Sequence, residues 1–483
     1  MSEINSLEPR IVWGFFDQIT QIPRPSKKEG EMIEFLERFA REHGLRHKKD
    51  RAGNVVITCT AAPSMKDKPA VVLQSHMDMV CEKNAEHTFD FDKDAIEAYI
   101  DGGWVKARGT TLGADDGIGM AAALAALTTT EVELPEIEAL FTVDEETGLT
   151  GAFNLERDML TGKFLINLDS EEEGEIFIGC AGGVDTVATF SFEPCKAEGD
   201  LAFFRLDISG LKGGHSGDDI DKGRANSNKL MARFLWNAMR GIELRVAKLN
   251  GGNLRNAIPR EAYALFGVPK PHIRPLFEMF EGFRDDALRE FGAAEPSMDI
   301  TISEAPCQES LLDKKSQRAL IDVLQGVPNG VLAMSAEMPG LVETSTNLAS
   351  VKQSDGNKIV VTTSQRSSID SARFNAAASV RSVFELGGGT VVNSDGYPGW
   401  KPDPESHILK VAKGCYLKLF DKKPKVRAIH AGLECGLFLQ KYPELQMISI
   451  GPTLRGVHSP DECLEIASVE KFWRFLLAIL QSI

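Results

Sequence analysis

Histidine and carboxylate side chains follow one apolar, strand-like stretch after another in this sequence. His76 and Asp78 come at the end of "AVVLQS", and Asp169 ends "KFLINLD". Open α/β sheets usually mount their catalytic groups where strands end, so these side chains could meet at one edge of a sheet. The positions of this kind are His76, Asp78, Asp115, Asp116, Asp144, Glu145, Glu146, Asp169 and His458.

Each of these positions also has an ordinary structural interpretation. The His76–Asp78 pair could be a structural hydrogen bond, and an aspartate between glycines before a helix, such as Asp115, is commonly an N-cap. Asp169 could start a loop, and His458 could lie on the surface. Three successive acids at residues 144–146 are harder to explain in this way, because they repel one another unless cations or donors compensate.

The recurrence of these residues indicates a metal site. Imidazole nitrogens and carboxylate oxygens without thiolates suit zinc, cobalt or manganese. Several converging carboxylates favour two metals over one, because a single zinc is usually satisfied by three protein ligands and water. A carboxylate bridging two ions about 3.5 to 4 Å apart would relieve the repulsion among the acids.

Motifs along nearly the whole chain resemble those of the aminoacyl-histidine dipeptidases, also called Xaa-His or cytosol non-specific dipeptidases. That group belongs to the di-zinc peptidases, which include peptidase T, peptidase V and carnosinase. The motifs are "SHMDMV", "GTTLGADDGIG", "DEETG", "NLDSEEEGEIFIGCAGG", "GLKGGHSG", "HAGLECG" and "GPTLRGVHSPDE".

The resemblance implies a site for two Zn²⁺ ions, for which Co²⁺ or Mn²⁺ could substitute. It implies that His76 and Asp169 bind one ion, and that Glu146 and His458 bind the other. Asp115 would bridge the two ions.

Neighbouring residues receive supporting roles from the same resemblance. Asp78 would orient the imidazole of His76, as metal-bound histidines usually require. Glu145 would be the general base. A cis peptide bond would join Asp115 to Asp116.

Four residues from other motifs are candidates for substrate contacts. The resemblance implies that His215 donates a hydrogen bond to the developing oxyanion, although a histidine between glycines could be an ordinary turn residue. It implies that Asn256 and Arg366 bind the C-terminal carboxylate of the substrate, although Arg366 could be a surface ion-pair partner. Gly432 would allow the backbone to approach a bound dipeptide, and His430 receives no role.

The implied activity is metal-dependent hydrolysis of dipeptides, Xaa-His dipeptides included. Acidic groups near the metals would favour a free N-terminal ammonium, and the carboxylate-binding residues would limit substrate length. A tripeptide aminopeptidase, an N-acyl amino acid deacylase and a non-catalytic metal-dependent binding protein remain alternatives. "GADDGIG" lacks the lysine and spacing of a phosphate-binding loop, and the sequence has no serine nucleophile elbow.

Composition restricts the partners and the compartment. A formal net charge of -16 disfavours nucleic acid or an anionic membrane as a partner. The resemblance implies small dipeptides as substrates and a possible homodimer. The first 20 residues lack the pattern of a secretory signal, so we expect a cytoplasmic protein. The 8 cysteines include no C-x-x-C pair, which indicates reduced, mostly buried thiols.

Strands alternate with helices in the first part of the chain, which predicts a mixed sheet with helices on both faces. The helix expected after Ser26 opens with Ser26 and Glu29 spaced as a capping box. Its apolar face consists of Met32, Phe35, Leu36, Phe39 and Ala40. Further strands are expected at 54–59, 70–75, 137–143, 163–169 and 444–452, and further helices at 117–127 and 468–480.

The order of the predicted strands and helices changes near residue 187. In a chain of 483 residues, this change predicts an inserted domain. We expect residues 1–186 and 389–483 to form a discontinuous catalytic domain, and residues 187–388 to form an α+β ferredoxin-like lid. Residues 201–268 run β-α-β-β, and a looser second set begins at "MDITIS". Two successive halves suggest a duplicated ferredoxin-like unit.

Overall fold

The computed structural model describes residues 3–197, 199–354 and 357–483, and the chain divides into two compact units. The first unit comprises Met1–Gly179, Trp400–Ala428 and Leu433–Ile483, and the second comprises Cys180–Gly399 and Ile429–Gly432. The expected boundary at 186/187 falls inside strand β9 (Gly182–Ser191). The expected boundary at 388/389 precedes β21 (Thr390–Asn393), which pairs with β9. The second unit is therefore longer at both ends than the sequence predicted, because both strands belong to its sheet.

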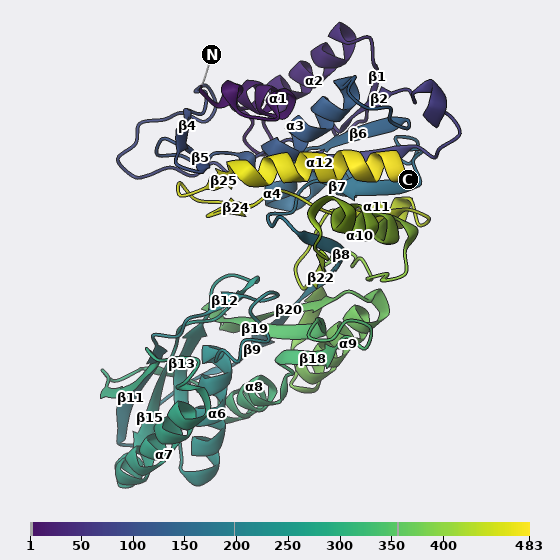
Figure 1. Ribbon diagram of the computed structural model, residues 1–483. Helices are drawn as coiled ribbons and strands as arrows, with labels where there is room; N and C mark the ends of the chain where they lie inside the picture. The colour runs from purple at the N-terminus through teal and green to yellow at the C-terminus, as the bar shows by residue number, and fades with distance from the viewer. Residues whose placement is uncertain (1–2, 198, 355–356) are drawn as a thin grey trace. The chain divides into compact units, whose positions relative to one another are not determined.

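An eight-stranded mixed sheet forms the centre of the first unit (Figure 1). The strand order is β1-β2-β6-β3-β7-β23-β8-β22, and β6, β3, β7 and β23 run parallel. The parallel strands therefore end at one edge, as the sequence predicted. The bounds are β1 Arg46–Lys49, β2 Val55–Cys59, β3 Val71–His76, β6 Ile137–Thr142, β7 Phe164–Asn167, β8 Glu175–Cys180, β22 Lys425–Ile429 and β23 Gln446–Ser449.

Helices pack around this sheet and bury its apolar strands. β3 and β6 are buried at every position, so they have the continuous apolar character of strands covered on both faces. The helices of the unit are η1 Glu3–Ser6, α1 Arg10–Thr20, α2 Gly30–Glu42, η2 Pro63–Met65, α3 Ala114–Thr128, α4 Glu145–Gly148, α5 Thr150–Asn154, α10 His407–Phe420, α11 Cys435–Lys441 and α12 Ile466–Ser482. A small sheet has the order β24-β25-β5-β4, with β4 Ala98–Asp101, β5 Trp104–Ala107, β24 Leu454–Arg455 and β25 Cys463–Glu465.

The start of α2 corrects one expectation. The five apolar residues predicted for its inner face are all buried, but Ser26 and Glu29 do not form a capping box. Ser26 instead donates its hydroxyl to Asp78, and the Glu29 carboxylate accepts the backbone N–H groups of Lys27 and Asp144. Neither side chain therefore caps α2: Ser26 contacts Asp78, two residues after β3, and Glu29 bonds to Lys27 and to Asp144, two residues after β6.

The second unit consists of two ferredoxin-like motifs, one nested in the other. The first is β11-α6-β13-β15-α7-β16, with the antiparallel strand order β16-β11-β15-β13. The second is β9-α8-β19-β20-α9-β21, with the equivalent order β21-β9-β20-β19. The duplication is thus present in the topology, but the two copies do not follow one another as we expected. "MDITIS" closes the first motif, and β9 opens the second.

The two motifs share a nine-stranded sheet, joined where β13 pairs with β19. Alternating burial along β11 shows that one face of the sheet is buried and the other is partly exposed. The strands are β10 Pro194–Lys196, β11 Leu201–Ser209, β12 Gly214–His215, β13 Arg245–Gly251, β14 Ala257–Ile258, β15 Ala262–Pro269, β16 Asp299–Glu304, β17 Ser310–Leu312, β18 Gly330–Met334, β19 Val342–Ser354 and β20 Lys358–Ser367. The helices are α6 Ser227–Gly241, η3 Lys270–His272, α7 Ile273–Phe291, α8 Lys314–Gly326 and α9 Asp370–Leu386.

Among the described residues, the cysteines form no disulfide, in agreement with the reduced thiols that the sequence predicts. The expectation of mostly buried thiols is wrong, because only Cys180, Cys415 and Cys435 are buried. Cys307 is exposed, and the other cysteines are partly exposed. Among the described residues, no helix combines the length and apolarity needed to cross a membrane.

An alanine at Phe266 should strongly destabilise the second unit. Phe266 is fully buried, and its ring centroid lies 6.5 Å from that of Phe204 and 6.2 Å from that of Phe234. The cavity left by Phe266→Ala should lower the free energy of unfolding by about 3–5 kcal/mol, measured by urea denaturation. The control Phe374→Ala removes a ring that is 54% exposed and should cost less than about 1 kcal/mol. Equal losses would contradict this description of the core.

Candidate metal centre

The predicted ligands all lie in the first unit, at or beyond the ends of its strands. His76 is the last residue of β3, and Asp169 follows β7 by two residues. Glu146 lies in α4, which begins shortly after β6. Asp115 lies at the start of α3, where its backbone departs from helical angles, and His458 lies in the loop after β24. Segments far apart in sequence thus contribute to one site.

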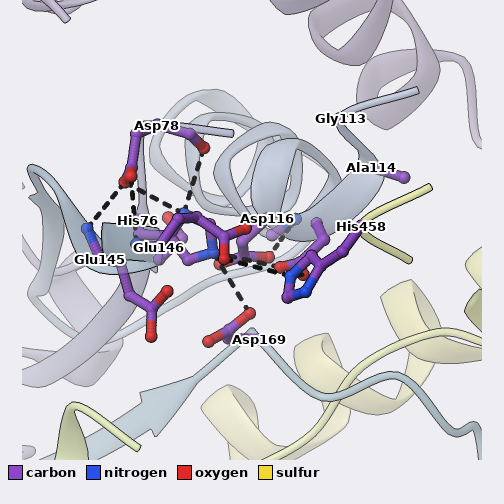
Figure 2. Close-up of polar contacts among 12 residues, drawn as sticks. His76, Asp78, Gly113, Ala114, Asp116, Glu145, Glu146, Asp169 and His458 are labelled. Atoms are coloured by element: carbon purple, nitrogen blue, oxygen red, sulfur yellow. Dashed lines mark hydrogen bonds and ion pairs between the residues drawn. The ribbon is translucent and has the colours of Figure 1, made fainter. Parts of the chain in front are cut away.

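Figure 2 shows the side chains of His76, Glu146, Asp169 and His458 gathered in one place, and both imidazoles contact the carboxylate of Asp115. His76 Nε2 lies 3.1 Å from Asp115 Oδ1 and 3.6 Å from Asp169 Oδ1. His458 Nε2 lies 3.2 Å from Asp115 Oδ2 and 3.1 Å from Glu146 Oε2. Each oxygen of Asp115 therefore faces a different imidazole, which is the arrangement expected of a bridging carboxylate.

These spacings fit two metal ions. Zinc bonds to nitrogen and oxygen are about 2.0–2.2 Å long, so neighbouring atoms of a tetrahedral site lie roughly 3.3 Å apart. The buried oxygen Glu146 Oε1 has no hydrogen-bond partner among the described residues, as expected of an atom left for a cation. Three groups have ligand atoms within 4.8 Å of one another: His76, Asp115 and Asp169; Asp115, Glu146 and His458; and His76, Glu145 and Glu146.

Electrostatics shows that the site needs positive charge. Burial and the neighbouring acids raise the pKa values of Asp169 and Glu145 well above the usual range. Hydrogen bonds to Asp115 and Glu146 raise the pKa of His458 to about 11. The protein alone would therefore hold protons among these groups, whereas bound cations would take their place.

Asp78 connects the end of β3, which carries His76, to the start of α4. Its Oδ1 lies 3.4 Å from His76 Nδ1 and accepts the backbone N–H of Glu145 at 3.0 Å. Its Oδ2 accepts the Ser26 hydroxyl at 2.7 Å and the backbone N–H of Glu146 at 3.2 Å. Although burial opposes ionisation, these bonds lower the pKa of Asp78 to about 2. Asp78 therefore fixes both the imidazole of His76 and the start of α4.

Two buried charged residues near the site were missed by the sequence analysis. Arg24 donates to the backbone oxygens of Met77, Asp78 and Gly113. Glu462 accepts backbone N–H groups of residues 112–115. Arg24 lies outside the quoted motifs, and Glu462 ends the motif "GPTLRGVHSPDE" but received no role. The cis peptide bond expected between residues 115 and 116 is present.

In the second unit, His215 and Arg366 lie together. His215 Nδ1 faces Asp218, 3.2 Å from its backbone nitrogen and 3.5 Å from its Oδ2. Arg366 Nη2 lies 3.4 Å from His215 Nε2, so a guanidinium and an imidazole lie close together, a pairing that favours an anionic oxygen beside them. The Nε of Arg366 is buried and has no partner among the described residues. Arg366 is thus not a surface ion-pair partner.

Tyr397 and His430 complete this cluster. The Tyr397 hydroxyl accepts a hydrogen bond from Arg366 Nη1 at 3.0 Å. His430 Nε2 lies 2.7 Å from the Ser345 hydroxyl oxygen, and burial lowers the pKa of His430 to about 4. A Cβ at Gly432 would lie 2.8 Å from the Tyr397 ring. Gly432 therefore leaves room for the tyrosine that contacts Arg366.

Asn256 lies beside the strand that carries His215. Its backbone oxygen accepts the N–H of Ser216 at 2.8 Å, while the residue itself is exposed. The next carbonyl, that of Ala257, accepts from the buried amide of Asn347 at 2.8 Å. The loop is anchored through its backbone, which leaves the Asn256 side chain available.

Comparisons with known proteins agree with the motif resemblance. Residues 72–482 match the model of peptidase family M20/M25/M40. The chain is 42% identical to the cytosol non-specific dipeptidase of Escherichia coli (strain K12) over 483 residues, covering 100% of this chain and 99% of the relative. It superposes on the aminoacylhistidine dipeptidase of Vibrio alginolyticus with a TM-score of 0.94 and 44% identity, covering 100% and 98% of the two chains. The aminopeptidase PepT of Bacillus cereus, at 16% identity and a TM-score of 0.58, shares the fold, with 99% of each chain covered.

A methyl group at residue 432 should be poorly tolerated. Gly432→Ala should lower the free energy of unfolding by about 1–3 kcal/mol, because Tyr397 must move away from the added Cβ. Gly282→Ala is the matched control in the same unit, since its Cβ would meet nothing within 4 Å and α7 should gain about 1 kcal/mol. Urea denaturation of both variants measures the difference. A neutral effect at residue 432 would contradict the packing described.

Proposed function

We proceed from the fact that this chain belongs to peptidase family M20/M25/M40, and we propose that it hydrolyses dipeptides, Xaa-His dipeptides included. The observation that carries the proposal is the convergence of two ligand groups on the shared carboxylate of Asp115. The names of the E. coli and Vibrio relatives support a dipeptide as the substrate.

The contacts within two of the candidate groups support the ligand roles that the motif resemblance implies. His76 and Asp169 would hold one ion, Glu146 and His458 would hold the other, and Asp115 would be shared by both. Two divalent ions held by these residues would supply a water of lowered pKa and would polarise the scissile carbonyl. Zinc is the proposed metal because the donors are imidazoles and carboxylates, a set that Co²⁺ or Mn²⁺ also accepts.

Glu145 is proposed as the general base that takes a proton from the attacking water and returns it to the leaving amine. Its carboxylate makes none of the contacts drawn in Figure 2, whereas its backbone N–H is held by Asp78. The side chain is therefore available for proton transfer from a fixed position. Asp78 would keep His76 oriented throughout the reaction.

The second unit is proposed to supply substrate-binding residues. Arg366 and Asn256 would bind the C-terminal carboxylate of the dipeptide, and the Nε2–H of His215 would donate to the developing oxyanion. The closeness of the Arg366 guanidinium to the His215 imidazole supports an anionic partner. Gly432 would contribute backbone close to the substrate.

Compartment and assembly are part of the proposal. The name of the E. coli relative assigns that protein to the cytosol, which supports a cytoplasmic location for this chain. A homodimer is proposed as the working assembly, with small peptides as the remaining partners.

A substrate panel tests the function directly. The metal-loaded protein should hydrolyse Ala-His and other free dipeptides, and a chelator should abolish turnover until Zn²⁺ is added back. A tripeptide exceeds the expected length, an acetylated amino acid lacks the free N-terminal ammonium, and a dipeptide amide lacks the C-terminal carboxylate. Each should be turned over at least about tenfold less well than a free dipeptide. Preference for the tripeptide or the acetylated amino acid would replace the dipeptidase proposal with the corresponding alternative.

Adjacent glutamates should respond differently to the same substitution. Glu145→Gln should lower kcat at least about 100-fold while two metals per chain are retained, because only the proton acceptor is lost. Glu146→Gln should lower both activity and metal content, because a ligand is lost. Turnover and metal analysis of the dialysed proteins measure these effects. Unchanged turnover in Glu145→Gln would eliminate the general-base assignment.

A further inference from the structure

Glu462 makes an unusual set of contacts for a residue with no assigned role. The residue is 2% exposed, and its carboxylate accepts four backbone N–H groups. Oε2 accepts from Leu112 at 2.8 Å and from Gly113 at 3.0 Å, and Oε1 accepts from Ala114 at 2.8 Å and from Asp115 at 3.2 Å. Both oxygens are thus fully used, with no capacity left for a metal.

The four donors belong to the loop that presents Asp115. Glu462 belongs to the turn that carries His458, since its own N–H donates to the Ser459 oxygen at 3.0 Å and the Ser459 hydroxyl donates to the Gly456 oxygen at 2.6 Å. One side chain therefore joins two loops that are more than 300 residues apart in sequence.

The two loops that Glu462 joins contribute more ligands to one of the two proposed metal sites than to the other. The group of Asp115, Glu146 and His458 takes a ligand from each of the two loops. The group of His76, Asp115 and Asp169 takes only Asp115 from them, and its other members lie at the ends of β3 and β7. Arg24 also holds the Gly113 carbonyl, so Asp115 keeps one anchor when Glu462 is lost.

We propose that Glu462 is a positioning residue that sets the spacing between Asp115 and His458. It thereby determines retention of the second metal ion, the one that Asp115, Glu146 and His458 would hold. A carboxylate suits this task because all four of its partners are donors. An amide of the same size would present its own N–H₂ to two of them and leave those bonds unmade. The inference rests on the proposed two-metal site and adds a residue that governs one ion selectively.

Metal counting on three variants tests the proposal. Glu462→Gln should weaken the second Zn²⁺ by about 10–100-fold, so that chains dialysed against buffered Zn²⁺ retain one ion instead of two. Glu138→Gln is the matched control: Glu138 is also buried and accepts backbone N–H groups of Thr161 and Gly162, remote from the ligands. Asp461→Asn removes a charge from the same turn at an exposed position. Both controls should retain two ions with wild-type affinity.

The outcomes separate this inference from the function on which it depends. A wild-type chain that binds fewer than two Zn²⁺ ions would overturn the two-metal site itself. Two ions bound with unchanged affinity by Glu462→Gln would overturn only the role of Glu462. Loss of both ions in parallel, or equal loss in Glu138→Gln, would also overturn it, since a general loss of stability is not selective for one ion.

Hydrogen exchange on the wild-type chain keeps the proposal testable if Glu462→Gln does not fold. The amides of residues 112–115 bond to Glu462 and not to a metal ligand. They should therefore be protected at least about tenfold over freely exposed amides in both the metal-free and the Zn²⁺-loaded protein. Protection that appears only on adding Zn²⁺ would show that the metal, rather than Glu462, orders the loop.

Discussion

Repulsion among carboxylates gathered at one edge of a sheet is the constraint on which the rest of this structure depends. Asp115, Glu146 and Asp169 lie within a few ångströms of two imidazoles and are largely removed from water. Two like charges 4 Å apart repel by about 4 kcal/mol at an effective dielectric constant of 20. The chain therefore holds an arrangement that becomes favourable only with protons or cations, and the spacing of the ligand atoms is suited to cations.

Further carboxylates hold the backbone around this cluster in place. Asp78, Glu29 and Glu462 each accept backbone N–H groups from a segment that carries ligands or flanks one. A hydroxyl or amide could accept some of these bonds, but a carboxylate accepts more of them and adds negative charge around the proposed metal site. The same side chains thus fix the backbone and deepen the electrostatic preference for divalent ions, at the cost of an unfavourable metal-free state.

The sequence predicts those parts of the site that have a local signature. Apolar strands ending in His76 or Asp169 can be recognised within about ten residues, and the motif resemblance assigns the ligand roles that spacing alone leaves open. The roles of Glu462 and Arg24 have no such signature, although Glu462 ends a quoted motif. Their partners are backbone groups of distant loops, and any sequence there offers the same N–H and C=O. Ser26 was misassigned for a related reason: a local cap and a distant carboxylate are equally good partners for its hydroxyl.

The fold of the second unit shows the same limit of local patterns. Strand and helix types were predictable from periodicity, but strand order was not. "MDITIS" was assigned to the second motif because it comes next in sequence, whereas its edge position beside β11 completes the first. Nesting has a physical rationale: β9 and β21, the first and last strands of the main segment of the unit, are neighbours in its sheet. The two ends of that segment therefore lie side by side, so it can be inserted into the first unit without separating the strands that carry His76, Asp169 and the α4 glutamates.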